Sequence, residues 1–140
     1  MKTLIAEDDF FCRLALQKLL GACGECHLAV NGREAVAVFQ QALQSQQAYT
    51  LVCLDILMPE MDGQTALKAM RAAEEARGIY SRRGAKIIMT TGLDDVQNIM
   101  KAFHGLCDGY LVKPVEPTKL NELLIQLKLR PAGADSAIPE

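Results

Sequence analysis

A stretch near the middle of the chain decides its fold: Leu51-Val52-Cys53-Leu54-Asp55. Four apolar residues run into a carboxylate, and such a run is too short for a helix. A short apolar run that ends at a charge is typical of a strand buried on both faces, as in a parallel sheet. The residues after Asp55, Ile56 to Pro59, do not begin a helix, so helix capping does not account for this aspartate.

Similar apolar runs occupy residues 3–6, 27–30, 86–89 and 110–112. Apolar residues at helical spacing follow each run, over residues 11–19, 35–43, 66–73, 96–103 and 120–127. Strands that alternate with helices indicate the α/β class. We therefore predict five βα units, (βα)5, that form an open, doubly wound, five-stranded parallel sheet with helices on both faces.

Composition limits the classes of protein. The chain has 140 residues, 15 Lys and Arg against 17 Asp and Glu, and a net charge of −2, which argues against bulk electrostatic binding of nucleic acid. No apolar stretch approaches the ~18 residues of a membrane span, and the N-terminus turns acidic too soon for a signal peptide. We expect a cytoplasmic protein with one domain over residues 1–129 and a disordered tail over 130–140.

Reactive polar residues stand where the predicted strands end. Glu7-Asp8-Asp9 follows the first run, Asp55 the third, Thr90-Thr91 the fourth and Lys113 the fifth. Because the carboxyl ends of parallel strands share one edge of the sheet, these side chains should converge there. Asp9 also precedes a helix and has a second interpretation as a helix cap.

The expected cluster has a specific chemistry. Asp8, Asp9 and Asp55 would repel one another unless a cation lies between them, and carboxylate oxygens suit Mg²⁺. Lys113 adds a positive charge and Thr91 a hydroxyl donor. Carboxylates, a divalent cation, a lysine and a hydroxyl together indicate phosphoryl transfer, with Asp55 as the nucleophile.

Four motifs carry a family resemblance: residues 5–10 (IAEDDF), 54–63 (LDILMPEMDG), 87–92 (IIMTTG) and 108–114 (DGYLVKP). With these motifs in this order, the chain resembles the receiver domain of bacterial two-component response regulators, of the stand-alone chemotaxis-regulator type. The resemblance covers about residues 2–128. It implies a flavodoxin-like fold with strand order 2-1-3-4-5.

The resemblance also implies a metal site and a phosphoacceptor. Asp55 would accept the phosphoryl group. Asp9, Asp55 and the main-chain carbonyl of Leu57 would bind Mg²⁺ (or Mn²⁺) directly, and Asp8 would bind it through a water molecule.

A switch follows from the same resemblance. Thr91 would hydrogen-bond the phosphoryl group, Lys113 would pair with a phosphoryl oxygen through a cis bond to Pro114, and Tyr110 would turn inward. The surface of the fourth helix, fifth strand and fifth helix would then change, which is a population shift between two packings.

The expected function is a phosphorylatable single-domain response regulator. Its partners would be a sensor histidine kinase or phosphotransfer protein and an unidentified downstream protein, with no direct contact to nucleic acid or membrane. The protein would be a monomer or a phosphorylation-dependent dimer. It would be a phosphoacceptor signalling domain and not an enzyme. Any self-dephosphorylation would be slow, because neither Leu57 nor Leu93 can orient a water molecule by hydrogen bonding.

Four alternatives stay open at this point. An aspartyl-phosphate phosphatase or phosphotransferase would need an acid at position 57, where leucine stands. A pseudo-receiver would lack the acids, the threonine or the lysine. Cys23-Gly24-Glu25-Cys26-His27 matches a haem-attachment pattern or a redox dithiol. The basic segment 72–86 is either a binding loop or, as we favour, a solvated connection.

Overall fold

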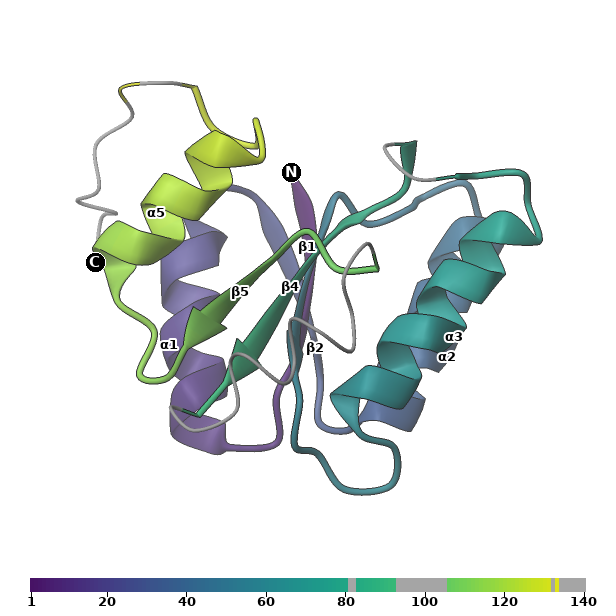
Figure 1. Ribbon diagram of the computed structural model, residues 1–140, viewed down its shortest axis with the longest axis horizontal. Helices are drawn as coiled ribbons and strands as arrows, with labels where there is room; N and C mark the ends of the chain where they lie inside the picture. The colour runs from purple at the N-terminus through teal and green to yellow at the C-terminus, as the bar shows by residue number, and fades with distance from the viewer. Residues whose placement is uncertain (81–82, 93–105, 132, 134–140) are drawn as a thin grey trace.

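A computed structural model describes residues 1–80, 83–92, 106–131 and 133. Its sheet has five parallel strands in the order β2-β1-β3-β4-β5, as predicted. Figure 1 shows the sheet between two layers of helices. The strands are β1 (Lys2–Ala6), β2 (Glu25–Ala29), β3 (Leu51–Asp55), β4 (Lys86–Thr91) and β5 (Gly109–Val112).

Four helices cover the sheet in the described part of the chain. They are α1 (Phe10–Gly21), α2 (Gly32–Gln44), α3 (Gly63–Glu75) and α5 (Pro117–Gln126). In Figure 1, α1 and α5 lie on one side of the sheet and α2 and α3 on the other. The helix predicted over residues 96–103 lies outside the described residues. None of the described helices is long and apolar enough to cross a bilayer.

Short polar side chains begin three of the helices. Asp9, Asn31 and Asp62 each accept a hydrogen bond from the backbone N–H three residues later. These bonds satisfy N–H groups that have no partner within the helix. Asn31 thus caps α2, and α3 begins three residues before its first predicted apolar position.

Side chains that alternate along the strands pack into two separate hydrophobic cores. One, which we call the α2/α3 core, includes Leu54 and Met89, and the other, the α1/α5 core, includes Cys53 and Ile88. Consecutive strand residues thus face opposite layers. Complete burial raises the pKa of the Cys53 thiol to about 12, so this cysteine packs as a small apolar residue.

Arg71 on α3 ties down the amino-terminal edge of the sheet. Its guanidinium donates to Glu74 Oε1 at 2.8 Å, to Asp108 Oδ2 at 2.9 Å and to the carbonyls of Ala85 and Leu106 at 2.8 and 2.7 Å. The second oxygen of Glu74 accepts from the Ala85 N–H. These bonds join α3 to the segments that enter β4 and β5, so both strands are held at the end opposite their carboxyl termini.

Candidate functional site

The predicted convergence of strand ends occurs around one lysine. Lys113, just after β5, places its Nζ 2.6 Å from Glu7 Oε1 and 3.1 Å from Asp55 Oδ2. Asp55 ends β3, and Glu7 directly follows β1. The lysine therefore reaches from the edge strand β5 to a carboxylate on the central strand β3 and to another just after β1. Lys113 is joined to Pro114 by a cis peptide bond, as the family resemblance implies.

Burial and charge set the protonation of this group. Glu7 is fully buried and Asp55 is 4% exposed. Burial, with the hydrogen bond and charge of Asp55, raises the pKa of Glu7 despite its bond to Lys113. Burial alone would lower the pKa of Lys113, but its hydrogen bonds to Glu7 and Asp55 raise it overall. The lysine is therefore firmly cationic between the two carboxyl groups.

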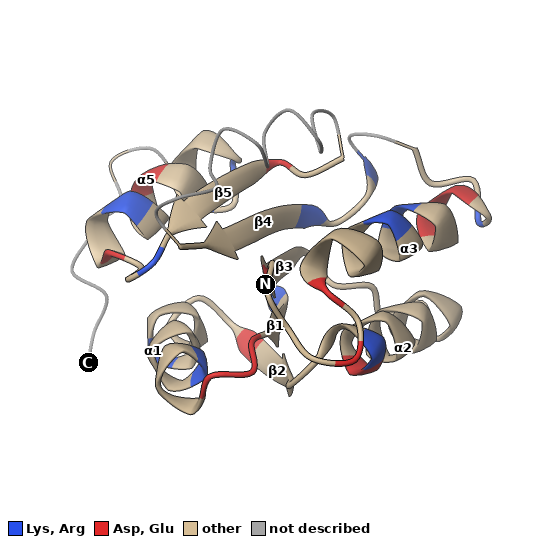
Figure 2. Cartoon of the chain, turned by 60° about the horizontal axis from the view of Figure 1, so that its bottom comes forward, with Lys and Arg blue, Asp and Glu red and all other residues tan. Residues whose placement is uncertain are grey.

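Three carboxylates lie close enough to hold a metal ion. Oxygens of Glu7, Asp8 and Asp55 all lie within 4.8 Å of one another. Oxygen ligands from carboxylates suit a hard divalent cation, and the cation would offset their mutual repulsion. Figure 2 shows the acidic turn between β1 and α1 that contributes to this cluster.

The structure differs from the sequence-based expectation at Asp9. This carboxylate accepts from the Cys12 N–H at 3.0 Å as the N-cap of α1, and that bond lowers its pKa. Glu7 takes the place in the acidic group that we expected for Asp9. β1 ends at Ala6, so Glu7 is the first side chain past the strand on the face of Asp55, whereas Asp9 stands two residues further on and caps α1. The position of Glu7 as the first polar residue after the apolar run could have indicated this.

Arg13 holds the acidic turn in place, a role that the sequence did not suggest. Its Nη1 donates to the carbonyl of Glu7 at 2.9 Å and to that of Asp8 at 3.4 Å. The guanidinium also lies over the Phe10 ring, 5.7 Å from its centroid. One positive side chain thus fixes the backbone of two acids while leaving their carboxylates free for other partners.

The loop after Asp55 requires a glycine at position 63. A Cβ there would lie 2.2 Å from the Asp55 carbonyl oxygen, and the Gly63 N–H donates to the Ile56 carbonyl at 2.9 Å. The start of α3 therefore packs directly on the backbone of Asp55. Leu57, two residues after Asp55, is 77% exposed.

Thr91 and Tyr110 lie on the other face of the sheet. Thr91 is buried, and its hydroxyl donates to the Gly92 carbonyl at 3.1 Å. Tyr110 is half-buried and packs against the α2/α3 core, on the side of Met89, its register partner. The structure thus groups Glu7 and Lys113 with Asp55 and sets the two expected switch residues apart from them.

A family model for the response regulator receiver domain matches residues 3–125. The chain belongs to this family. The resemblance inferred from the four motifs is therefore confirmed, and so is the predicted α/β fold.

Two curated relatives illustrate the range of the family. The regulatory protein VanRB of Enterococcus faecalis is 32% identical over 133 residues, which are 94% of this chain and 53% of VanRB. The chemotaxis protein CheY of Thermotoga maritima is 28% identical over 125 residues, 88% of this chain and 93% of CheY. The chain spans about half the length of the first curated relatives it matches.

Solved structures agree with the fold. One similar structure is the complex of the Saccharomyces cerevisiae phosphotransfer protein Ypd1 with the receiver domain of Ssk1. The match has a TM-score of 0.75 and 25% sequence identity, and it covers 97% of this chain and 95% of the other. A second is the CheX–CheY–BeF₃–Mg²⁺ complex of Borrelia burgdorferi, with a TM-score of 0.76. The match covers 93% of this chain and 90% of the other, and at 23% sequence identity it supports the fold alone.

The motif Cys23-Gly24-Glu25-Cys26-His27 contributes to packing and hydrogen bonding within the fold. Cys23 and Cys26 are half-buried and pack against the α1/α5 core. His27 Nδ1 lies 2.6 Å from the Tyr49 hydroxyl and its Nε2 lies 2.7 Å from Glu25 Oε1. Both ring nitrogens are thus engaged in hydrogen bonds, which leaves neither for a haem iron.

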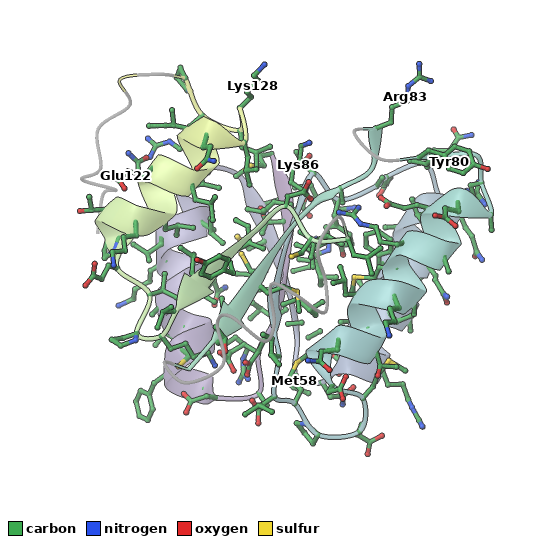
Figure 3. All side chains as sticks on the ribbon, in the orientation of Figure 1. Met58, Tyr80, Arg83, Lys86, Glu122 and Lys128 are labelled. Carbon is green, nitrogen blue, oxygen red and sulfur yellow. The ribbon has the colours of Figure 1, made fainter. Side chains whose placement is uncertain are left out.

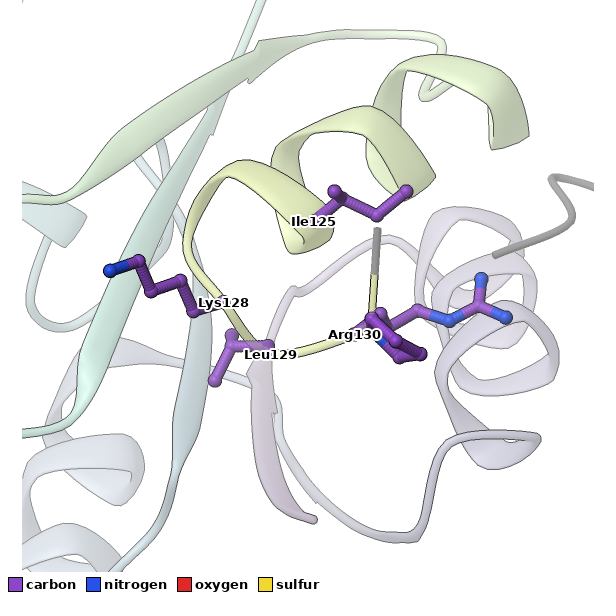
Figure 4. A pocket seen from close by; sticks show the side chains of 5 residues that line it. Ile125, Lys128, Leu129 and Arg130 are labelled. Atoms are coloured by element: carbon purple, nitrogen blue, oxygen red, sulfur yellow. The ribbon is translucent and has the colours of Figure 1, made fainter. Parts of the chain in front are cut away.

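Two surface features of the receiver lie away from the acidic cluster. In the connection between α3 and β4, Tyr80 is 61% exposed and Arg83 extends away from the sheet (Figure 3). A pocket of about 560 Å³ lies beyond the last turn of α5 (Figure 4). It is lined by Ile125, Lys128, Leu129, Arg130 and Pro131. Lys113 precedes the other end of this helix, so the pocket belongs to a different region.

Proposed function

We propose that this receiver accepts a phosphoryl group on Asp55 from a phosphohistidine of a sensor histidine kinase or phosphotransfer protein. The observation that carries the proposal is the contact of Lys113 with Asp55 beside Glu7 and Asp8. A lone buried aspartate would be costly, whereas one paired with a lysine at a sheet edge is a ready nucleophile.

Phosphoryl transfer to Asp55 breaks one bond for each bond that it forms. An Asp55 carboxylate oxygen forms a bond to phosphorus as the phosphorus–nitrogen bond of the donor breaks, and the electron pair of that bond returns to the imidazole. Asp8 and Asp55, with the Leu57 carbonyl, would hold Mg²⁺ (or Mn²⁺) directly, with Glu7 acting through water. The bound cation offsets negative charge on the transferring group. Lys113 adds a second positive charge at the same oxygens.

The phosphoryl donor would dock on an apolar surface beside Asp55. Phe10 is 59% exposed, and Phe11 and Leu57 are each 77% exposed. Phe10 and Phe11 pack edge to face, with ring centroids 5.5 Å apart. Large exposed apolar side chains beside a reactive group favour a protein partner over a small substrate.

We infer a signalling output rather than enzymatic turnover. Phosphorylation adds nearly two negative charges beside Lys113 and offers Thr91 a new acceptor. Thr91 and Tyr110 would then rearrange and alter the surface that β5 and α5 share with the expected fourth helix. The downstream partner would be another protein, and the receiver would act as a monomer or phosphorylation-dependent dimer in the cytoplasm, without contact to nucleic acid.

The decisive test is Mg²⁺-dependent labelling with acetyl phosphate, followed by intact mass spectrometry. We expect one phosphoryl group on the wild-type protein and none on Asp55→Asn. Labelling should disappear when EDTA removes the metal. Labelling that survives the Asp55→Asn substitution would refute the assignment.

A further inference from the structure

Thr90, on β4, has an unusual buried hydroxyl. Its side chain is 1% exposed, and its Oγ1 has no hydrogen-bond partner among the residues that the structure describes. A buried hydroxyl without a partner lowers stability, and such groups are rare in folded proteins. Valine has nearly the same shape and would avoid this cost. The hydroxyl therefore calls for an explanation, and the position of Thr90 in the sheet suggests one.

Strand register makes Thr90 the neighbour of the proposed phosphoacceptor. Thr90 pairs with Asp55 on one side and with Leu111 on the other. Strand alternation sets Asp55 on the face of Cys53 and Thr90 on the face of Ile88, and both of those residues belong to the α1/α5 core. Asp55 and Thr90 are thus side-by-side residues on one face of the sheet.

Lys113 must extend past β4 to make its contacts. It follows β5, whereas Asp55 ends β3, and β4 lies between these two strands. Adjacent strands are ~4.8 Å apart, so the lysine crosses about two strand spacings on the face that carries Asp55. On that face and at that level, the residue of β4 is Thr90.

The lysine has donors to spare. An ammonium group carries three N–H bonds, and two of them account for the contacts with Glu7 and Asp55. The side chain of Lys113 is only 24% exposed, so water has limited access to the third. Threonine has nearly the volume of valine, and its hydroxyl oxygen can accept a hydrogen bond from this third N–H.

We propose that Thr90 is a positioning residue for Lys113, whose ammonium withdraws from Glu7 when Asp55 carries a phosphoryl group and then donates a hydrogen bond to the Thr90 hydroxyl. The inference rests on the proposed function and specifies how that site is regulated. The phosphoryl charge on Asp55 draws the ammonium away from Glu7, which follows β1, and therefore back toward β4. Thr90 stabilises the displaced lysine and hence the phosphorylated form.

The test is the affinity of the Mg²⁺-loaded protein for beryllofluoride, a phosphoryl mimic, measured by ¹⁹F NMR titration. Loss of a hydrogen bond to a charged group should weaken binding about tenfold in Thr90→Val. Thr90→Ser retains the hydroxyl and should bind within about twofold of wild type. In ¹⁵N-labelled lysine spectra, the Lys113 ammonium should shift on beryllofluoride binding in wild type and shift differently in Thr90→Val.

Thr3 supplies a matched control. Its hydroxyl is also buried and without a hydrogen-bond partner among the described residues, and it lies on the same face of the sheet. It stands near the start of β1, however, at the edge opposite the acidic cluster. Thr3→Val should therefore bind beryllofluoride like wild type.

Urea unfolding without metal provides an independent readout. Thr90→Val should be at least as stable as wild type, because it removes a hydroxyl that has no partner in the structure. Equal beryllofluoride affinities in Thr90→Val and wild type would overturn this inference alone. The inference would also be overturned if Thr90→Val both bound beryllofluoride more weakly and unfolded at lower urea, and Thr90→Ser showed the same two losses. Wild-type protein that binds no beryllofluoride would overturn the Asp55 assignment as well.

Discussion

The Lys113 ammonium lies closer to Glu7, at 2.6 Å, than to Asp55, at 3.1 Å. The proposed phosphoacceptor therefore shares its lysine with a fully buried carboxyl group. That competition has a measurable pH dependence.

Replacement of Glu7 by glutamine should change how stability varies with pH. The pKa of Glu7 is raised above 4.5 in the folded protein, chiefly by burial, so the folded state holds this proton more tightly than the unfolded chain. Its stabilising contribution is complete below pH 4.5 and is lost as the pH rises through the raised pKa. In EDTA, the free energy of unfolding of Glu7→Gln, relative to wild type, should thus increase as the pH rises above 4.5. A difference that stays flat over this range would contradict the prediction.

Asp8 and Asp9 should differ sharply in metal binding, although they are adjacent. Asp8→Asn should weaken Mg²⁺ binding about tenfold or more in calorimetric titration, because it removes a charge from the acidic cluster. Asp9→Asn should bind Mg²⁺ nearly as wild type and keep the cap of α1, since asparagine caps helices as well as aspartate does. Equal losses in the two variants would restore Asp9 to the metal site.

Gly63→Ala should reduce both stability and phosphorylation. The added methyl group would meet the Asp55 carbonyl oxygen at 2.2 Å, so the backbone of the phosphoacceptor must shift. We expect a loss of about 1–3 kcal/mol in urea unfolding and slower labelling by acetyl phosphate. Gly21→Ala is the control, because a Cβ there has nothing within 4 Å. A Gly63→Ala protein as stable as wild type would contradict the packing described above.

Leu57 should prolong the life of the phosphoryl group. Its side chain is 77% exposed beside Asp55 and cannot orient a water molecule by hydrogen bonding. Phospho-Asp55 should therefore decay slowly, and Leu57→Asn should accelerate its decay, measured by loss of the phosphorylated mass over time. Leu57→Met retains the apolar character and should leave the rate unchanged. An unchanged or slower decay in Leu57→Asn would count against this role.

Arg71→Met should destabilise the protein by about 3–5 kcal/mol, because it leaves the buried Glu74 carboxylate without its cation. The exposed pair of Lys119 and Glu116, 3.8 Å apart, offers a contrast. Lys119→Met should change the free energy of unfolding by no more than about 1 kcal/mol. Similar losses in both variants, measured by urea denaturation, would argue against a special role for Arg71.

The sequence predicted most of the fold because its signals are local. Apolar runs such as residues 51–54 mark buried strands, and their polar ends identify the sheet edge at which Asp55 and Lys113 meet. The choice between Glu7 and Asp9 was harder, since three consecutive acids look alike until the last residue of β1 is known. Glu7 and Asp9 would face the same side of an extended strand, so only the end of β1 shows that Glu7 lies beside Asp55 while Asp9 caps α1.

Contacts between distant segments could not be predicted in this way. Arg71 meets Asp108 across 37 positions of sequence. Arg13 bonds a carbonyl only six positions away, but main-chain acceptors have no sequence signature. The burial of Thr90 without a partner is likewise visible only when the register of β3, β4 and β5 is known.

Thr90 and Thr91 are consecutive but face opposite layers, one beside Asp55 and the other on the side of Tyr110. A single peptide unit at the end of β4 therefore joins the face of the sheet on which Asp55 would gain charge to the face on which Tyr110 would move. A shift of the β4 backbone at this peptide would affect both faces at once. Coupling between them would therefore not need a series of side chains around the edge of the sheet.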